Sequence, residues 1–438
     1  MSATAARTAA LEVLRAVRRG DLADRALVRE QEVLAPRDRA LVHELVFGTL
    51  RLRGRLDHAL AAFSSRPIGA LDADVLDALR LGAYQLLELD GVPAYAAISE
   101  TVELVKLAAP KASGFANAVL QALHRGRAEL TFPALAADPR AHLATWGSHP
   151  AWLVARWIAH FGVEETAALV AANNARPELF LRVLRGSGTE AVAALAEQGI
   201  AAETSPLDTQ LVRIDNGADV PAALRTVPAV VQDPAAALVV RFAAVPSSAL
   251  VADLCAAPGG KALGLAAGAH YTVAADLSLR RLRRVRENRD RVQAQQPLPL
   301  RLGLVVADGR APPLRPLDAV LLDVPCTGTG TLRRHPDGRW RVGPRDLAAL
   351  VALQRTLLDA AAARVRPGGL LIYATCSLEP EENEDQVRSF LEREPQFSLE
   401  PGSAVAPGLI DAHGFLRVLP QRQGCDGAFA ARLRRSGR

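Results

Sequence analysis

The chain has 438 residues, of which 50% are hydrophobic and 23% are charged, so it can bury two or three hydrophobic cores and should be a globular, multi-domain protein. Its net charge of +5 favours a polyanionic partner without proving one. The N-terminus MSATAARTAALEVLRAVRRG lacks the pattern of a secretory signal, and no apolar stretch reaches membrane-spanning length. We therefore expect a cytoplasmic protein that does not enter a membrane.

Residues 4 to about 127 have the apolar spacing of successive helices. Ala10, Leu14 and Val17 fall on one helical face, and later segments repeat the same spacing with almost no strand-like alternation. We predict an all-helical domain over residues 1–130. This part of the sequence shows no catalytic constellation of its own.

The next part of the chain changes in composition. Residues 131–150 are rich in proline and loop-forming residues and are the predicted linker. Helix-like runs then mix with short β-rich pieces at 179–184 and 210–214, which predicts a small α+β module over residues 145–225.

From residue 226 to residue 438 short apolar runs alternate with helical stretches, and several of these runs end in a carboxylate or a cysteine. The expected buried strands are 249–254, 271–276, 304–308, 319–323 and 370–375. Strands that alternate with helices predict a doubly wound, Rossmann-like α/β domain. Ligands of such domains bind beyond the carboxyl ends of the strands, where the polar residues of this domain lie.

A glycine-containing turn joins the first of these strands to a helix. Gly259 and Gly260 permit close approach of the backbone, and the helix start offers unpaired N–H groups to an anionic or carboxylate-bearing ligand. The turn matches neither a P-loop nor the dinucleotide-binding motif G-x-G-x-x-G. The candidate cofactor-binding residues of this turn are Cys255, Ala256, Ala257, Pro258, Gly259, Gly260 and Lys261.

Two carboxylates follow at the ends of the next strands. Asp276 can accept hydrogen bonds from both ribose hydroxyls of an adenosine group. Asp308, which ends the third strand, suits the edge of an adenine ring. Each aspartate could instead cap a helix or lie in solvent, and Asp276 alone would also suit NAD, so the identity of the cofactor depends on the chemistry further along the chain.

The cysteines, at 255, 326, 376 and 425, form no C-x-x-C pair, so the sequence predicts neither a disulfide framework nor a metal site. Cys326 follows the fourth predicted strand and Cys376 the fifth, so the two thiols should face one cleft. A thiolate that adds to carbon 6 of cytosine makes carbon 5 nucleophilic enough to accept a methyl group, and a second thiol could exchange the protons that follow. Simple burial is the alternative for each cysteine and the expected explanation for Cys425.

Several motifs together resemble a known family. The segments DLCAAPGGK (253–261), DVPCTGTGTLRRHPDGRW (323–340) and YATCSLEPEENEDQV (373–387) are similar to the motifs of RNA 5-methylcytosine methyltransferases. The first 125 or so residues resemble the NusB-type RNA-binding helical domain. This pairing resembles the RsmB (Sun, Fmu) family, which methylates small-subunit ribosomal RNA.

The resemblance implies S-adenosylmethionine as the cofactor, Cys376 as the nucleophile and Cys326 as the thiol that assists release. It also implies that Asp323 belongs to the cofactor site and lies close enough to the methyl group to touch the cytosine. Two departures concern fine contacts: Ala262 and Leu263 stand where relatives often carry hydroxyl residues, and Thr327 stands for the usual serine.

Arginines near Cys326 are the expected RNA contacts, because they lie beside the reacting cleft in sequence: Arg333, Arg334, Arg339 and Arg341. The arginine-rich run 280–291 is expected to be mainly a solvated helix face. The same chemistry on transfer RNA, and a non-catalytic RNA-binding role in ribosome assembly, remain as alternatives. We expect a monomer.

Overall fold

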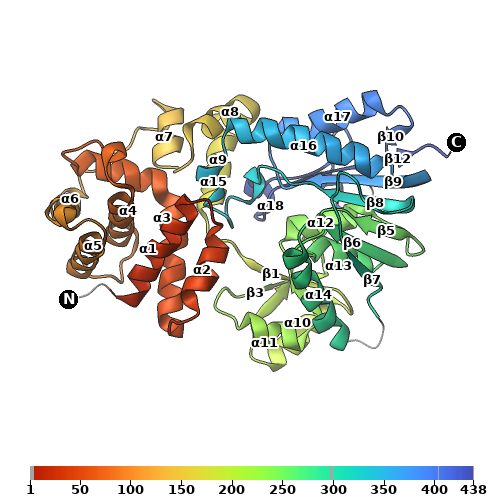
Figure 1. Cartoon of the computed structure of the whole chain (residues 1–438), viewed down its shortest axis with the longest axis horizontal. Helices are drawn as coiled ribbons and strands as arrows, with labels where there is room; N and C mark the ends of the chain where they lie inside the picture. The colour runs from red at the N-terminus through yellow and green to blue at the C-terminus, as the bar shows by residue number, and fades with distance from the viewer. Residues whose placement is uncertain (1–3, 296–298, 403, 438) are drawn as a thin grey trace. The chain divides into compact units, whose positions relative to one another are not determined.

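The computed structural model describes residues 4–295, 299–402 and 404–437. The chain divides into two compact units, shown in red to yellow and in green to blue in Figure 1. A helical unit contains Met1–Ala175 together with His335–Gly343, and a sheet unit contains Arg176–Arg334 together with Pro344–Arg438. This division differs from the predicted boundaries, because the small α+β module joins the sheet unit while nine residues from the predicted third domain, 335–343, join the helical unit.

The helical unit contains successive helices, as its apolar spacing predicts. They are α1 (Ala5–Arg18), α2 (Ala23–Gln31), α3 (Pro36–Phe63), α4 (Ala73–Glu88), α5 (Ala94–Ala108) and α6 (Ser113–Gly126), with short 3-10 turns η1 (Ile68–Ala70) and η2 (Pro110–Ala112). Apolar side chains spaced along these helices form one buried cluster, which includes Leu14, Leu45, Leu56 and Leu79. Asp72 starts α4 by accepting hydrogen bonds from the backbone N–H groups of Asp74 and Val75.

The predicted linker, 131–150, contains a helix rather than only loop. Asp138 caps α7 (Pro139–Thr145), and Pro139 occupies the first helical turn, where its missing N–H costs nothing. Helices α8 (Ala151–Phe161) and α9 (Val163–Asn174) complete this part of the helical unit.

The segment 335–343 is anchored in the helical unit by its short helix α15 (Gly338–Arg341). Arg339 is 1% exposed, and its guanidinium donates hydrogen bonds to the backbone carbonyls of Arg51, Ser148 and Asn173 at 2.9, 3.1 and 2.6 Å. Burial and the nearby charge of Arg51 lower the pKa of Arg339 well below its ordinary value. This side chain therefore ties helices α3 and α9 to the inserted segment.

The small module of the sheet unit is a four-stranded antiparallel sheet with the order β2-β3-β1-β4. Its elements are β1 (Leu179–Val183), α10 (Gly188–Glu197), β2 (Ala202–Thr204), β3 (Leu211–Ile214), α11 (Val220–Thr226) and β4 (Ala229–Val231). The predicted β-rich pieces correspond to β1 and β3. Ser187 and Glu190 form a capping box that starts α10.

The large sheet has the strand order β10-β12-β9-β8-β5-β6-β7, with β11 paired to β12. Its strands are β5 (Leu250–Asp253), β6 (Tyr271–Asp276), β7 (Leu302–Val306), β8 (Leu317–Asp323), β9 (Val365–Thr375), β10 (Phe397–Leu399), β11 (Leu416–Val418) and β12 (Ala428–Arg435). Its helices are α12 (Pro234–Ala243), α13 (Gly260–Ala266), α14 (Leu279–Ala294), α16 (Pro344–Ala362), α17 (Glu384–Arg393) and α18 (Pro420–Gln423), with the 3-10 turns η3 (Thr329–Thr331), η4 (Pro380–Glu382) and η5 (Pro407–Leu409).

Side chains alternate between the two faces of this sheet. Val251 and Leu321 pack in one apolar cluster with residues of α12, whereas Ala252 and Leu322 pack in another with residues of α16 and α17. Helices therefore cover both faces, as Figure 1 shows. This explains why the strands are nearly continuous apolar runs instead of alternating apolar and polar residues.

The strands β9, β8, β5, β6 and β7 run parallel. The chain leaves β5 toward β6 and β7 and returns to β8 on the other side of β5, so the sheet has its topological switch point at the carboxyl ends of β5 and β8. The doubly wound fold is confirmed. The antiparallel strand β12 pairs with β9 along Leu370–Thr375 and extends the sheet beyond the expected strands. None of the helices that the structure describes is long and apolar enough to cross a membrane.

Replacing Arg339 with methionine should destabilise the helical unit by about 3 kcal/mol, because three buried carbonyls lose a charged donor. The tryptophans at 146, 152, 157 and 340 all belong to this unit, so urea unfolding followed by tryptophan fluorescence reports on it. The control is Arg345→Met, at an exposed position of α16. Equal unfolding midpoints for the two variants would contradict the structural role of Arg339.

Candidate active site

The chemically important residues lie at the carboxyl edge of the parallel sheet. Asp253, Asp276 and Asp323 are the last residues of the neighbouring strands β5, β6 and β8. Cys376 follows the last residue of β9, next to β8. Asp308 does not end a strand as predicted but lies two residues beyond β7.

The turn between β5 and α13 is held by Asp276. Its carboxylate accepts hydrogen bonds from the N–H groups of Ala257 (3.1 Å) and Ser278 (2.9 Å), and the side chain is 3% exposed. Gly259 has a φ of +108°, and a Cβ there would lie 2.9 Å from Val285 Cγ1, so both the backbone conformation and the packing require glycine. Contacts within the protein therefore fix the conformation of this turn.

Lys261 connects the turn to the carboxyl end of β8. Its ammonium lies 2.7 Å from Asp323 Oδ2. Burial alone would lower the pKa of Lys261, but the charge and hydrogen bond of Asp323 and the nearby Cys376 raise it. Lys261 therefore stays positively charged beside Asp323 and close to the Cys376 sulfur.

Asp253 is an additional buried carboxyl group for which the sequence analysis gave no role. It is 1% exposed, and the Lys261 ammonium and the backbone N–H of Cys255 favour its charged form. Burial, followed by the charge of Asp323, raises the pKa of Asp253 to about 8. Asp253 is therefore mainly neutral at pH 7, and its place at a strand end was the available sequence signal.

Cys326 and Cys376 meet as predicted. Their sulfur atoms are 3.2 Å apart, and both side chains are partly buried. The two loops that carry them are joined by bonds from Gly330 N–H to the Cys376 carbonyl (2.9 Å) and from Leu378 N–H to the Thr329 hydroxyl (2.9 Å). The approach of the two thiols therefore follows from the backbone and does not depend on flexible side chains alone.

Glu382 fixes the Cys326 loop. Sequence reasoning missed this role, although Glu382 lies within the motif 373–387 that also contains Cys376. Its buried carboxylate accepts hydrogen bonds from Thr327 N–H (2.9 Å), the Thr327 hydroxyl and the Gln354 amide (2.8 Å). Serine at position 327 would supply the same hydroxyl, so this departure from the family pattern changes little. Ala262 and Leu263 are buried in the apolar core around α13, which accounts for the other departure.

The thiols of Cys326 and Cys376 differ in their environment. The hydrogen bond to Cys376, burial, and the charges of Cys376 and Glu382 raise the pKa of Cys326 well above its ordinary value. Cys326 is therefore held as a protonated thiol that can donate to the Cys376 sulfur. Burial and the neighbouring carboxylates likewise raise the pKa of Cys255 to about 12, which makes Cys255 an unreactive thiol. Cys425 is 2% exposed, and its expected burial is confirmed.

The predicted RNA-binding arginines have different environments. Arg339 is buried, as described above, and Arg334 pairs with Asp233 at 2.6 Å and with Asp426 at 3.1 Å; neither position fits a phosphate contact. Arg333 donates to the carbonyls of Arg176 and Gly424. Arg341 keeps 34% of its side chain exposed and lies on the helical unit.

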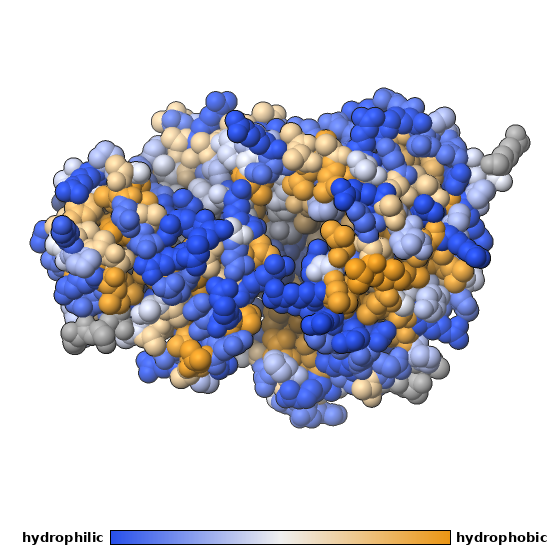
Figure 2. All heavy atoms as spheres, viewed as in Figure 1, coloured by the Kyte–Doolittle hydropathy of each residue, from blue (hydrophilic) through white to orange (hydrophobic). Residues whose placement is uncertain are grey.

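Hydrophobic side chains also reach the surface near this edge. Figure 2 shows a hydrophobic patch over the part of the sheet unit that holds β5, β6 and β7. Leu277, directly after Asp276, is 71% exposed, and Val306, at the end of β7, is 52% exposed. An exposed leucine beside the strand-end carboxylate of Asp276 offers an apolar surface for a flat ring.

Hydrogen peroxide should convert Cys326 and Cys376 into an intramolecular disulfide. One thiolate attacks the peroxide and becomes a sulfenic acid with loss of hydroxide, and the second thiol then displaces water from that sulfur. The 3.2 Å separation of the sulfurs makes this second step fast. Intact mass should fall by two hydrogen atoms, and peptide mapping should find the cross-link. Separate overoxidation of the two thiols, with no cross-linked peptide, would contradict the geometry; Cys326→Ser is the control.

Asp253 should make stability depend on pH. Because its folded-state pKa, about 8, lies above the ordinary aspartate value, the folded protein keeps a proton that the unfolded chain releases between about pH 4 and 8. This stabilisation is complete below pH 4 and is lost as the pH rises through 8. Relative to Asp253→Asn, the wild type should lose about 1 kcal/mol per pH unit from pH 5 to 7.5. Unfolding followed by circular dichroism measures this, with Asp385→Asn on the exposed start of α17 as control; parallel curves for wild type and Asp253→Asn would count against a raised pKa.

Family models match the three parts of the chain. Residues 4–125 match the NusB family, residues 149–221 a ferredoxin-like domain of RsmF/B-like methyltransferases, and residues 243–434 the 16S rRNA methyltransferase RsmB/F family. The fold agrees with these matches. A solved structure titled PH0851 superposes with a TM-score of 0.80 at 25% identity and covers 99% of both chains. NSun6 from Pyrococcus horikoshii, solved with SFG, shares the fold with a TM-score of 0.55 at 21% identity, over 65% of this chain and 98% of its own.

Two relatives match nearly the whole length. Putative methyltransferase MT1451 of Mycobacterium tuberculosis is 38% identical over 98% of this chain and 96% of its own. Ribosomal RNA small subunit methyltransferase B of Yersinia pseudotuberculosis is 35% identical over 92% of each chain. On this identity and coverage, together with the matching family models and fold, the chain belongs to the RsmB family of RNA methyltransferases.

Proposed function

We propose that this enzyme transfers a methyl group from S-adenosylmethionine to carbon 5 of a cytosine in small-subunit (16S) ribosomal RNA, through a covalent bond between Cys376 and the base. The observation that carries the proposal is the 3.2 Å approach of the Cys326 and Cys376 sulfurs at the sheet edge that also holds Lys261 and Asp323. Two thiols with different environments suit a reaction that needs one nucleophile and one proton-exchanging group.

The carboxyl edge suits S-adenosylmethionine. Asp276 would accept the ribose hydroxyls, because each carboxylate oxygen already fixed by a backbone N–H retains a second acceptor site. Exposed Leu277 would lie against the adenine, and Asp308, which is now paired with Arg310, would meet the adenine edge. The remaining proposed contacts come from the turn and β8: Cys255, Ala256, Ala257, Pro258, Gly259, Gly260, Lys261 and Asp323. When bound, S-adenosylmethionine supplies an electrophilic methyl group.

Cys376 is the proposed nucleophile. The Lys261 ammonium, whose pKa the nearby Cys376 helps to raise, and the Cys326 sulfur at 3.2 Å both lie close to its sulfur. The sulfur adds to carbon 6 of the cytosine, and the electron pair of the 5,6 double bond becomes available at carbon 5 to take the methyl group. Asp323, fixed by Lys261, is close to the same edge and would accept a hydrogen bond from the cytosine amino group.

Cys326 is proposed to complete the reaction. After methyl transfer the carbon 5 proton must leave, and the resulting electron pair restores the double bond as the carbon 6–sulfur bond breaks. The Cys326 sulfur lies beside the departing Cys376 sulfur, and Glu382 fixes its loop through Thr327. Cys326 would exchange protons with the base and the leaving thiolate in this step.

Ribosomal RNA is the proposed substrate because the Yersinia relative, similar over 92% of both chains, is named for methylation of small-subunit ribosomal RNA. The NusB-family match over residues 4–125 supports an RNA partner. The target base must leave any stack it occupies in order to reach Cys376, so an unpaired or easily flipped cytosine is expected. Incubation with methyl-labelled S-adenosylmethionine and either naked 16S ribosomal RNA or transfer RNA tests this choice; label in transfer RNA alone would reject it.

Cys376→Ala should abolish both methyl transfer and covalent RNA attachment, lowering the rate at least about a thousandfold, because no other group activates carbon 5. Cys326→Ala should still attach to RNA and transfer the methyl group once, but it should accumulate a protein–RNA adduct that survives denaturing electrophoresis. Labelled RNA and labelled methyl donor, used in separate gels, distinguish the two steps. Methylation by Cys376→Ala, or an adduct formed by Cys376→Ala and not by Cys326→Ala, would reverse the assignment.

A further inference from the structure

We propose that the helical unit contains a second RNA site, a cavity between α1, α3, α4 and α15 that binds one nucleotide of the substrate RNA other than the target cytosine. This proposal rests on the proposed function, since it takes the RNA to be the substrate. The cavity has a volume of about 370 Å³. Its lining includes Arg18, Thr49, Arg53, Asp337, Trp340 and Arg341, all of which belong to the helical unit.

The cations of this cavity are unequally compensated. Arg80 pairs closely with Asp57 (2.7 Å) and Asp77 (3.0 Å), and Arg18 pairs with Asp77 at 3.0 Å. These contacts account for the fixed positions of both arginines. Arg53 has a weaker partner, since its ion pair with Asp57 spans 3.8 Å.

Arg53 is therefore the cation best placed to take an anion. Its side chain is 36% exposed and lines the cavity. Burial and repulsion from Arg80 lower the pKa of Arg53, which shows that the protein compensates this charge incompletely. A phosphate within hydrogen-bond distance would compensate it and would compete only with the 3.8 Å contact to Asp57.

Two buried polar atoms of the lining lack hydrogen bonds among the described residues. They are the hydroxyl of Thr49 and Oδ2 of Asp337. The two residues are 2% and 3% exposed, respectively. Asp337 Oδ2 lies 3.4 Å from Arg341 Nε, too far for a good hydrogen bond. Buried polar groups are nearly always paired, so the lining calls for a ligand that supplies at least one N–H or O–H donor as well as a negative charge.

Trp340 adds an aromatic surface. Its indole N–H donates to the Leu50 carbonyl at 2.7 Å, which fixes the ring, and the Arg53 guanidinium lies 5.2 Å from the ring centroid. A phosphate at Arg53 would thus bring its own sugar or base beside the indole. Cation, aromatic ring, hydroxyl and carboxylate together match the phosphate, base face and donor groups of a nucleotide.

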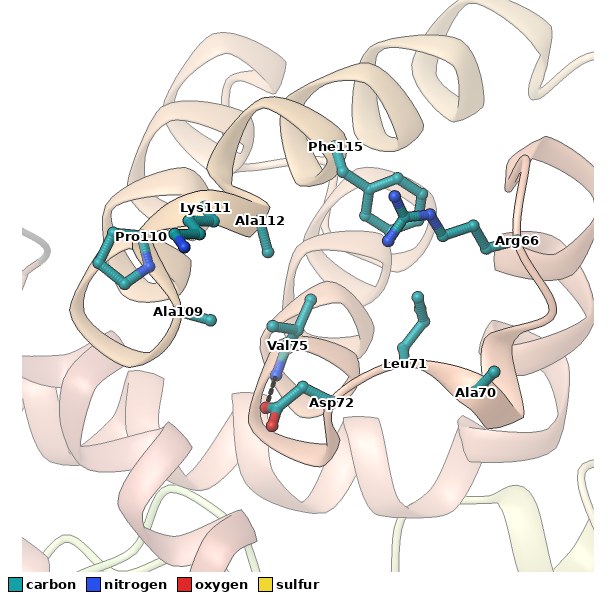
Figure 3. A pocket seen from close by; sticks show the side chains of 10 residues that line it. All are labelled: Arg66, Ala70, Leu71, Asp72, Val75, Ala109, Pro110, Lys111, Ala112 and Phe115. Atoms are coloured by element: carbon teal, nitrogen blue, oxygen red, sulfur yellow. Dashed lines mark hydrogen bonds between the residues drawn. The ribbon is translucent and has the colours of Figure 1, made fainter.

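A second pocket of the helical unit lacks these features. Figure 3 shows it between η1, α4, η2 and α6, with Arg66 beside Phe115 and Lys111 on the far wall. Its carboxylate, Asp72, already caps α4. No lining residue of this pocket, all within the described part of the chain, has a buried polar side-chain atom without a partner. The comparison favours the Arg53 cavity as the nucleotide site.

The test measures binding of 16S ribosomal RNA without cofactor by Arg53→Gln, Arg341→Gln and Thr49→Val. The matched control is Arg37→Gln, an exposed arginine in the first turn of the same helix α3. We expect Arg53→Gln to weaken binding about tenfold and to reduce the slope of log Kd against log salt by about 0.7 to 0.9. In methylation assays KM for RNA should rise while kcat at saturating RNA stays unchanged, because Arg53 does not belong to the proposed catalytic edge.

The outcomes separate this site from the proposed reaction. If the wild type methylates 16S ribosomal RNA but Arg53→Gln and Arg341→Gln bind it as tightly as Arg37→Gln does, the nucleotide site is rejected and the proposed function stands. If the wild type neither binds nor methylates this RNA, both proposals fall. Should Arg53→Gln unfold, Arg341→Gln and Thr49→Val decide alone, and wild-type affinity in both rejects the site.

Discussion

The charge balance at the carboxyl edge of the parallel sheet depends on the ion pair between Lys261 and Asp323. Parallel strands bring Asp253, Asp276 and Asp323 to one edge, where burial makes every uncompensated charge costly. Lys261 neutralises Asp323 at 2.7 Å, whereas Asp253 reduces its cost by keeping a proton. The edge can therefore develop negative charge on a cysteine sulfur without gathering several unpaired carboxylates around it.

Local contacts within the sheet unit hold the turn at Gly259 and the Cys326 loop in place. Gly259 packs against Val285 of α14, and Asp276 holds the turn through Ala257. On the other side, Glu382 holds the Cys326 loop through Thr327. These contacts come from elements covering the sheet, so the positions of both sulfurs follow from the packing of the domain. Preorganisation of this kind reduces the reorganisation needed when a base arrives.

The sequence predicted the parts of the structure that are encoded locally. The apolar runs that became β5, β6, β8 and β9 are long and bounded, and their terminal carboxylates and cysteines identify the site edge. The short strands β10 and β11 carry too few residues for a clear pattern. Asp253 and Glu382 were missed because their importance depends on burial and on partners that only the fold brings near, such as Thr327 and Gln354 for Glu382.

The arginines were predicted as RNA contacts from their proximity in sequence, and this prediction also failed where the fold supplied partners. A cluster near Cys326 in sequence suggested one RNA surface, yet Arg334 meets two carboxylates and Arg339 meets backbone carbonyls from distant parts of the chain. Proximity in sequence does not indicate whether a guanidinium has an internal partner. An arginine is available for an RNA contact only if the fold leaves its charge incompletely compensated, and within the cavity of the helical unit Arg53 meets this condition.

The segment 335–343 links the two proposed roles covalently. The chain leaves the Cys326 loop, enters the helical unit through α15, and returns to the sheet unit at α16. Hydrogen bonds from Arg339 anchor this segment, and the next residue, Trp340, lines the cavity beside Arg53. A nucleotide that binds against Trp340 would therefore contact a segment that follows the Cys326 loop directly in the chain.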